Sequence, residues 1–359
     1  MNTPTINAEH TRVLLSKHYN TYPELQTEDI FKYLYHSAFG CDHLVTNEAA
    51  ALHYIQAEYA AQGDRAPDLI EPLDGAYVRV HLGVLQGGLR PQTLARLFCL
   101  SAQKEAQGTA HLEKGLEIAQ QMIADGTLPL DGKAFAAQAD AWRTAGFPAL
   151  HHSDAFREAY HPAYRVIAKQ YAAILPLLTE IDKRMANGST IVAIEGGSAS
   201  GKSTLAETLR QIYNCNLFHT DDFFLQPAQR TQARLAEVGG NLDRERFQEE
   251  IVLPLLAGNP VCYRRFDCAT QTLGEPITVP HAELTVVEGA YSMHPAFGHY
   301  YHLSVFLDVE PALQQERIEI RNTPRLAKRF FGEWIPMENA YFAQMRAKDR
   351  ADLILHVQA

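Results

Sequence analysis

Residues 196–204, GGSASGKST, combine closely spaced glycines with a lysine and hydroxyl side chains. The pattern of Gly, four residues and then Gly-Lys-Ser is typical of a loop whose backbone N–H groups surround a phosphate. The N-terminus of a following helix adds partial positive charge. We expect Lys202 to reach the β- and γ-phosphates of a nucleotide and the Ser203 hydroxyl to bind Mg²⁺. The residues expected to bind the nucleotide are Gly196, Gly197, Ser198, Ala199, Ser200, Gly201, Lys202, Ser203 and Thr204.

Two acidic side chains follow apolar runs further along the chain. Asp221 lies in HTDDFFL, and Glu288 lies in LTVVEGAYS. Carboxyl ends of strands in an open α/β sheet face the ligand crevice, so both carboxylates are expected near the loop. Asp221 could accept the proton of an acceptor hydroxyl or help to hold the metal, and Glu288 could bind Mg²⁺ directly or through water. A turn or helix-capping role is the alternative for Asp221.

A basic stretch, ERIEIRNTPRLAKRF, occurs late in this acidic chain. Arg317 and Arg321 are four residues apart and share one helix face, and Arg325 follows in the next segment. Such a cluster can clamp a transferring phosphoryl group as a mobile lid. A solvated helix face, paired with neighbouring glutamates, is the alternative.

The spacing of apolar residues predicts which elements position these side chains. Helical segments at 244–258 and 310–322 lie between short apolar runs rich in β-branched residues, which read as buried parallel strands. This alternation predicts an α/β fold, a P-loop domain with a mostly parallel, doubly wound sheet, over residues 188–359. The predicted strands are 190–195, 216–221, 284–289, 303–309 and 352–357.

The pattern of residues 1–187 predicts a separate, mainly helical domain, whose role the sequence does not indicate. Segments with apolar residues three and four apart end repeatedly on glycine. Residues 76–84 alternate like a strand, and residues 163–188 are expected to form one or two helices interrupted near Pro176.

Ten of the sixteen histidines lie before residue 188. Their spacing matches no zinc-binding pattern, and histidines that cap, pack or face solvent are the alternative to a metal or catalytic site. A contribution to the acceptor pocket or to a homodimer interface also stays open. The metal-competent residues in the two richest stretches are His36, Cys41, Asp42, His43, His151, His152 and His161.

Composition limits the classes of partner. The formal net charge is −10 and the pI is about 5.9, which disfavours a general nucleic-acid surface. Five scattered cysteines fit reduced thiols, and we find neither a signal-peptide layout nor an apolar run long enough to cross a bilayer. We therefore expect a cytoplasmic protein with no nucleic-acid or membrane partner.

The C-terminal half, roughly residues 188–357, resembles the uridine kinase and phosphoribulokinase group of P-loop small-molecule kinases, which also includes bacterial-type pantothenate kinase. The segments GGSASGKST, TDDFF, NLDRERF, VVEGAY and ERIEIRNTPR occur in the order of that family. The resemblance implies ATP- and Mg²⁺-dependent transfer of the γ-phosphate to a hydroxyl of a small metabolite. Asp221 takes the place of the catalytic base and Glu288 that of the Mg²⁺-supporting acid. Asp243 matches the aspartate that holds ribose hydroxyls, and the lid arginines match Arg317, Arg321 and Arg325.

The acceptor-reading segment departs from the uridine kinase pattern. Phe266 and Gln271 stand where a tyrosine and a histidine read the base. Phenylalanine donates no hydrogen bond and glutamine offers a different set of donors and acceptors, so specificity for uridine is not expected. Arg264 and Arg265 add positive charge that suits a carboxylate or phosphate on the acceptor, or they are surface residues.

Two other classes of function stay open at this stage. One is a nucleotide-gated regulator whose helical half binds a partner. The other is a bifunctional protein whose helical half is a separate enzyme, possibly metal-dependent.

Overall fold

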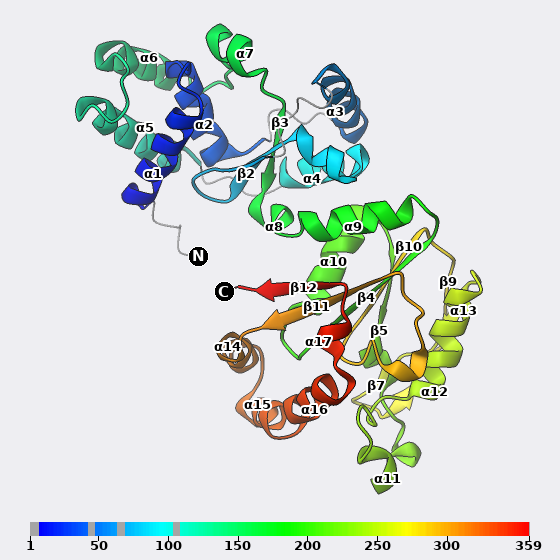
Figure 1. Cartoon of the computed structure of the whole chain (residues 1–359). Coiled ribbons are helices and arrows are strands. Elements are labelled where there is room, and N and C mark those ends of the chain that lie inside the picture. The colour runs from blue at the N-terminus through cyan, green and yellow to red at the C-terminus, as the bar shows by residue number, and fades with distance from the viewer. Residues whose placement is uncertain (1–6, 42–46, 63–68, 103–107, 359) are drawn as a thin grey trace. The chain divides into compact units, whose positions relative to one another are not determined.

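A computed structural model describes residues 7–41, 47–62, 69–102 and 108–358 and divides the chain into two compact units (Figure 1). Met1–Thr179 form the N-terminal unit, and Glu180–Ala359 form the C-terminal unit. The division falls within helix α9 (Leu175–Met185), a few residues before the change of pattern at residue 188.

The N-terminal unit is mainly helical, as predicted. Helix α2 begins after Gln26 with a capping box completed by Asp29. Its buried Phe31 stacks on Trp142, with ring centroids 4.9 Å apart, and meets the buried ring of Phe135 edge-on. These aromatic contacts join α2 to α6 around a shared core. The helices are α1 (Ala8–Thr21), α2 (Thr27–Phe39), α3 (Glu48–Gln62), α4 (Pro91–Ala102), α5 (Gly108–Ala124), α6 (Gly132–Thr144), α7 (Asp154–Tyr160) and α8 (Lys169–Ala172).

A three-stranded antiparallel sheet also belongs to this unit. Strand β2 (Tyr77–His81) lies between β1 (Ile70–Pro72) and β3 (Tyr164–Ala168), and the predicted strand within 76–84 is confirmed as β2. The expectation of one or two helices over 163–188 is wrong at its start. The chain there forms β3, because burial of Val166 and Ile167 against β2 outweighs helix propensity. Two helices follow, α8 and α9 (Leu175–Met185), and the break at residues 173–174 directly precedes Pro176, so the predicted interruption near Pro176 is confirmed. Pro176 itself occupies the second position of α9, where proline is tolerated.

The C-terminal unit contains one five-stranded sheet whose strands are all parallel, in the order β12-β11-β4-β10-β5. Strand β4 precedes the glycine-rich loop and lies at the centre. The register sets Ile194 of β4 opposite Glu288 of β10, and Glu288 opposite His219 of β5. All five predicted strands are confirmed as β4 (Thr190–Gly196), β5 (Asn216–His219), β10 (Leu284–Glu288), β11 (Leu303–Val309) and β12 (Leu353–Val357).

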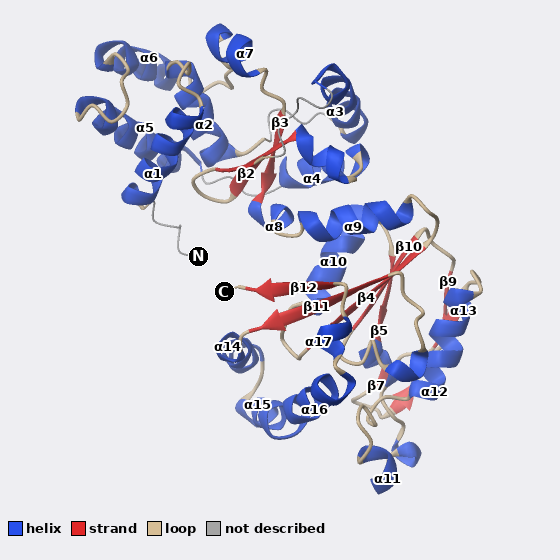
Figure 2. Ribbon diagram, viewed as in Figure 1, coloured by secondary structure: helices blue, strands red, loops and turns tan. Residues whose placement is uncertain are grey.

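Helices cover both faces of this sheet (Figure 2), as the doubly wound fold requires. On one face, Ile191 and Val287 share a core cluster with Phe247 and Leu255 of the α12–α13 segment and with Tyr341 of α16. Helix α10 packs against β4, β5 and β10 through residues outside that cluster. The helices are α10 (Lys202–Tyr213), α11 (Gln232–Leu235), α12 (Arg244–Phe247), α13 (Leu253–Leu256), α14 (Pro311–Arg321), α15 (Pro324–Arg329), α16 (Ile335–Met345) and α17 (Ala347–Arg350).

Two small antiparallel pairs complete the unit: β6 (Val261–Tyr263) with β9 (Ile277–Val279), and β7 (Phe266–Asp267) with β8 (Thr272–Leu273). Among the described residues of the whole chain, none of the helices is both long and apolar enough to cross a membrane.

Candidate active site

The glycine-rich loop connects the central strand β4 to helix α10. Gly196 and Gly201 have φ of 147° and 99°, in the region that L side chains rarely adopt. A Cβ on Gly196 would lie 2.7 Å from the carbonyl oxygen of Leu307, so the close approach to β11 also requires glycine. Lys202 begins α10, and its Nζ donates to the carbonyl oxygen of Gly197 at 2.9 Å. The loop and the helix N-terminus thus have the backbone arrangement of a P-loop, the kind of loop whose N–H groups can surround a phosphate.

Ser203 and Glu288 meet next to this loop. The Ser203 hydroxyl donates to Glu288 Oε1 at 3.0 Å, and the buried Glu288 ends strand β10. His219 Nδ1 contacts the same carboxylate oxygen, and this hydrogen bond raises the pKa of His219 above its usual value. A hydroxyl and a carboxylate oxygen at one point are donors that Mg²⁺ prefers, so the residues present fit that ion. The described residues contain no group of three His, Cys, Asp or Glu that could hold a metal, and a nucleotide-bound Mg²⁺ does not need one.

Asp221 follows β5, in the short 3₁₀ helix Thr220–Phe223. Solvent reaches this residue, yet protein atoms crowd its carboxylate, and the loss of hydration raises its pKa. Lys202 opposes the rise, whereas the negative charges of Glu288 and Glu338 add to it. Asp221 lies two residues after the end of β5, the strand that pairs with β10, and β10 ends at Glu288.

Of the three arginines expected in a lid, one contacts the phosphate-binding loop. Arg317 on α14 donates through Nη1 to the carbonyl oxygen of Ala199 at 3.3 Å. Arg321 ends α14 and Arg325 lies in α15; both are exposed, and no contact between either side chain and the loop is seen within the described residues. The structure therefore brings Arg317 to the site and leaves the other two at the surface.

Two carboxylates that the sequence analysis missed also contact the loop. Glu338 on α16 accepts hydrogen bonds from Ser198 N at 2.8 Å and Ser198 Oγ at 2.6 Å. Gln314 on α14 donates to the carbonyl oxygen of Ser198 at 2.8 Å. No local pattern marks Glu338, because 140 residues separate it from Ser198.

Glu195, the second missed carboxylate, lies in β4 directly before the loop and is fully buried. It accepts hydrogen bonds from the backbone N–H groups of Gly196, Tyr291 and Met293 at 3.0–3.1 Å, and from the Tyr341 hydroxyl at 3.0 Å. Burial raises the pKa of Glu195 to about 7, against the effect of these hydrogen bonds. An acid inside an otherwise apolar strand is the sequence signal that could have identified it.

Among the residues expected to contact the acceptor, Asp243 already has partners. This buried residue caps α12, accepting from Arg246 N at 3.2 Å, and its other oxygen accepts from Gln229 Nε2 at 3.0 Å. An ion pair with Arg246 at 3.4 Å adds to this arrangement. The geometry therefore gives Asp243 a structural role as a helix cap.

The other three expected acceptor residues belong to the β7–β8 region. Phe266 is buried in β7, with the Arg230 guanidinium 5.7 Å from its ring centroid. Gln271 lies in the turn before β8 with φ of 59°, and its Nε2 donates to the carbonyl oxygen of Cys268 at 2.6 Å. Arg264 is exposed, whereas its neighbour Arg265 pairs with Asp222 at 3.3 Å.

The metal-competent residues of the N-terminal half do not form a metal site among the described residues. His151 and His161 are exposed, and the buried Cys41 Sγ lies 3.7 Å from the carbonyl oxygen of Phe98. His152 pairs with Asp29 instead of a metal. His36 is buried and accepts from Arg79, and Asp42 and His43 lie outside the described residues.

Comparisons with known proteins find similarity among solved structures, at low identity. No family model and no curated protein matches the sequence. A structure described as a possible uridine kinase from Bacillus stearothermophilus aligns at 19% identity and a TM-score of 0.38, over 50% of this chain and 99% of that chain. Shikimate kinase from Bacteroides thetaiotaomicron aligns at 14% identity and a TM-score of 0.25, over 46% of this chain and 85% of the other.

At these identities and TM-scores, substrate and mechanism do not follow from the likeness. The strand order and the glycine-rich loop after the central strand identify the C-terminal unit as an α/β P-loop domain.

Proposed function

We propose that the C-terminal unit is an ATP- and Mg²⁺-dependent kinase that transfers the γ-phosphate to a hydroxyl of a small metabolite. The observation that carries this proposal is that Lys202, Ser203 and Glu288 lie together at the carboxyl edge of one parallel sheet, with Asp221 just after the neighbouring strand β5. Lys202 and the Ser203–Glu288 pair lie at the loop, and Asp221 lies within their electrostatic influence. Phosphoryl transfer needs mainly positioning and charge stabilisation, which this arrangement supplies.

In this proposal, the loop N–H groups and Lys202 bind the nucleotide phosphates, and Ser203 and Glu288 hold Mg²⁺. Bound Mg²⁺ supplies neutralisation of phosphate charge. Arg317, which already reaches the loop at Ala199, adds positive charge where the phosphoryl group is transferred.

Asp221 is the proposed general base, with assistance to the metal as a second role. A carboxylate with a raised pKa accepts a proton more readily at neutral pH than an ordinary aspartate does. The acceptor hydroxyl would donate its proton to Asp221 as its oxygen attacks the γ-phosphorus, and ADP would leave.

We do not expect uridine to be the preferred acceptor. The buried Phe266 ring can stack but cannot hydrogen-bond a base, and the amide of Gln271 donates within its own turn. Arg264 and Arg265 on the adjoining segment favour an acceptor that carries a carboxylate or phosphate group.

The test is ADP release by the whole chain with nucleosides, pantothenate, glycerate and sugars as acceptors, together with ATP hydrolysis without an acceptor. Asp221→Asn should lower transfer by about 10²–10⁴-fold and leave ATP binding unchanged. Asp349→Asn, an exposed aspartate in the same unit, is the matched control. Full transfer by Asp221→Asn would show that this aspartate is not the base. Preferred turnover of uridine would show that our interpretation of Phe266 and Gln271 is wrong.

A further inference from the structure

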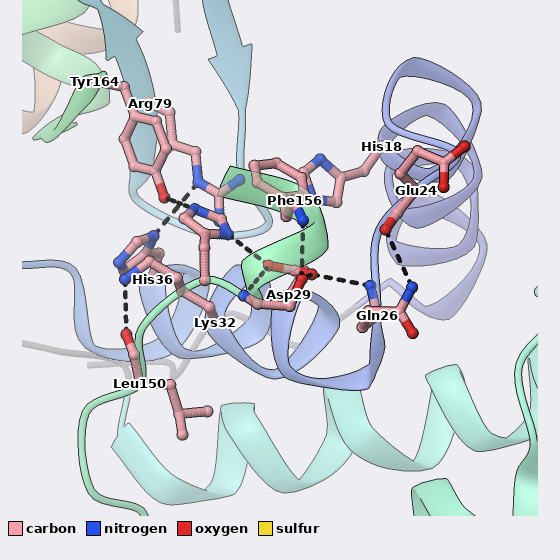
Figure 3. Close-up of polar contacts among 12 residues, drawn as sticks. His18, Glu24, Gln26, Asp29, Lys32, His36, Arg79, Leu150, Phe156 and Tyr164 are labelled. Atoms are coloured by element: carbon pink, nitrogen blue, oxygen red, sulfur yellow. Dashed lines mark hydrogen bonds and ion pairs between the residues drawn. The ribbon is translucent and has the colours of Figure 1, made fainter. Parts of the chain in front are cut away.

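The N-terminal unit encloses a cluster of charged and aromatic side chains around Arg79 of β2 (Figure 3). Arg79 is fully buried, and its Cζ lies 5.2 Å from the ring centroid of Tyr33 and 4.7 Å from that of Tyr164. Its Nε donates to His36 Nδ1 at 3.4 Å, and Nη1 donates to Glu71 Oε2 at 3.5 Å. Both hydrogen bonds are long, so the guanidinium is only loosely held by its protein partners.

The third nitrogen of this guanidinium has no hydrogen-bond partner within the part of the chain that the structure describes. Arg79 Nη2 is buried and carries two N–H donors. Leaving a buried donor unpaired costs about 1–3 kcal/mol, and more for a charged group. A fully buried arginine in this state needs an acceptor that the described residues do not supply.

His18 presents a second unpartnered atom in the same cluster. Its Nδ1 lies 2.7 Å from Glu71 Oε1, while its buried Nε2 has no partner among the described residues. A carboxylate on Nδ1 favours the tautomer with hydrogen on that nitrogen, which leaves Nε2 with a free lone pair. Burial lowers the pKa of His18, so the ring stays neutral and Nε2 remains an acceptor.

The two unpartnered atoms belong to one neighbourhood. His18 and Arg79 both contact Glu71. The ring of Tyr33 lies against both side chains, and its centroid is 4.5 Å from that of the His18 ring. His81 Nε2 is also buried without a hydrogen bond and lies 3.7 Å from Glu71 Oε2. Three side chains around Glu71 therefore each have a nitrogen atom that makes no hydrogen bond to the described residues.

The adjoining part of the cluster is fully bonded. Asp29 accepts from His152 Nδ1 at 2.6 Å and from Ser153 Oγ at 2.7 Å, and His152 Nε2 accepts from the Tyr164 hydroxyl at 2.6 Å. These groups satisfy one another and need no ligand. The contrast restricts the ligand to the side of the cluster where Arg79 and His18 lie.

We propose that the N-terminal unit binds a small oxyanion that also carries an O–H group, either a phosphate group or a 2-hydroxycarboxylate. Arg79 Nη2 donates to a charged oxygen of the ligand, and His18 Nε2 accepts from its hydroxyl. The site lies wholly within the N-terminal unit and does not depend on the kinase proposal.

The experiment uses the full chain carrying Lys202→Ala, which weakens phosphate binding at the loop of the C-terminal unit. Isothermal titration with inorganic phosphate and with glycolate tests the two ligand chemistries, and sulfate and acetate serve as anions without the O–H group. Arg79→Lys and His18→Asn are added singly to this background. Asparagine can keep a hydrogen bond to Glu71 while removing the Nε2 acceptor. The exposed His151→Gln is the matched control, and circular dichroism checks the fold.

We expect phosphate or glycolate to bind more tightly than sulfate or acetate, and whichever binds identifies the ligand class. Arg79→Lys and His18→Asn should each weaken binding by about tenfold or more, as the loss of a charge-assisted or buried hydrogen bond implies. Should Arg79→Lys fail to fold, His18→Asn alone decides. The proposal is wrong if neither phosphate nor glycolate binds at concentrations up to about 10 mM. Such a concentration would saturate even a weak specific site. It is also wrong if binding survives unchanged in the folded variants.

Discussion

The two units hold their ionisable side chains in contrasting ways. In the C-terminal unit, Asp221 and Lys202 follow strand ends or the loop beside them and lie where solvent and a ligand can reach. In the N-terminal unit, Arg79, Asp29 and His18 are at most 2% exposed, and aromatic rings lie against Arg79 and His18. The first arrangement suits a ligand that enters and leaves at every turnover. The second makes the stability of the unit depend on its buried charges, because a buried charge without a partner destabilises the folded state.

The largest expected effect tests the open site. Lys202→Ala should lower phosphoryl transfer by about 10²–10³-fold, since one preorganised charge at the phosphates is lost. The N-terminal unit should unfold at the same denaturant concentration as before. A steady-state ADP assay and urea unfolding followed by Trp142 fluorescence, in a Trp334→Phe background, measure the two outcomes. If Lys202→Ala also lowered the stability of the N-terminal unit, the proposed contrast between a ligand site in one unit and stabilising buried charges in the other would be wrong.

The next effect concerns acid sensitivity of the buried cluster. Burial lowers the pKa of His152 from 6.5 to about 4, although its hydrogen bond to Asp29 opposes this. The unfolded chain therefore binds a proton below pH 6.5 that the folded unit does not. Stability should be constant above pH 6.5 and fall between pH 6.5 and 4, by up to about 1.4 kcal/mol per pH unit.

His152→Gln should flatten this dependence on pH, and the adjacent, exposed His151→Gln should leave it as it is. The readout is the urea midpoint of the N-terminal unit at several pH values. An unaltered slope in His152→Gln would mean that other groups carry the acid sensitivity.

A smaller effect is expected at the phosphate-binding loop. The carboxylate of Glu338 accepts hydrogen bonds from Ser198, so it brings a negative charge to the glycine-rich loop that we propose binds phosphate. Glu338→Gln keeps an acceptor for Ser198 N and removes the charge, so ATP should bind about threefold to tenfold more tightly. Glu333→Gln, an exposed change in the preceding segment, serves as control. Weaker ATP binding by Glu338→Gln would instead assign Glu338 to holding the loop in shape.

The smallest effect is expected at the surface of the N-terminal unit. Arg143 makes two hydrogen bonds to Glu113, at 2.7 and 2.8 Å, but both side chains are partly solvated. Glu113→Gln should therefore change the free energy of unfolding by less than about 1 kcal/mol. A loss of about 3–5 kcal/mol, as expected on breaking a buried pair, would contradict the distinction between buried and exposed pairs.

The same contrast explains what the sequence could predict. The glycine-rich loop, Asp221 and Glu288 are marked by local patterns, because each follows a short apolar run that becomes a strand of one sheet. The cluster around Arg79 has no such pattern. Its residues come from α1, α2, β1, β2 and the region of β3, and only tertiary packing assembles them. Glu338 was missed for the same reason, and the strand at β3 was mistaken for helix because its partner β2 lies far away in the sequence.

Glu195 connects three separate segments through one carboxylate. The N–H groups of Gly196, Tyr291 and Met293 and the hydroxyl of Tyr341 all converge on it, and Tyr291 adopts an uncommon φ of 76° for a residue with a side chain. The start of the loop, the turn after β10 and helix α16 therefore cannot loosen one at a time without exposing this buried acid. In amide hydrogen exchange, these three N–H groups should exchange together, at the rate of a single shared opening. Such an opening sets the speed at which this side of the nucleotide site can rearrange.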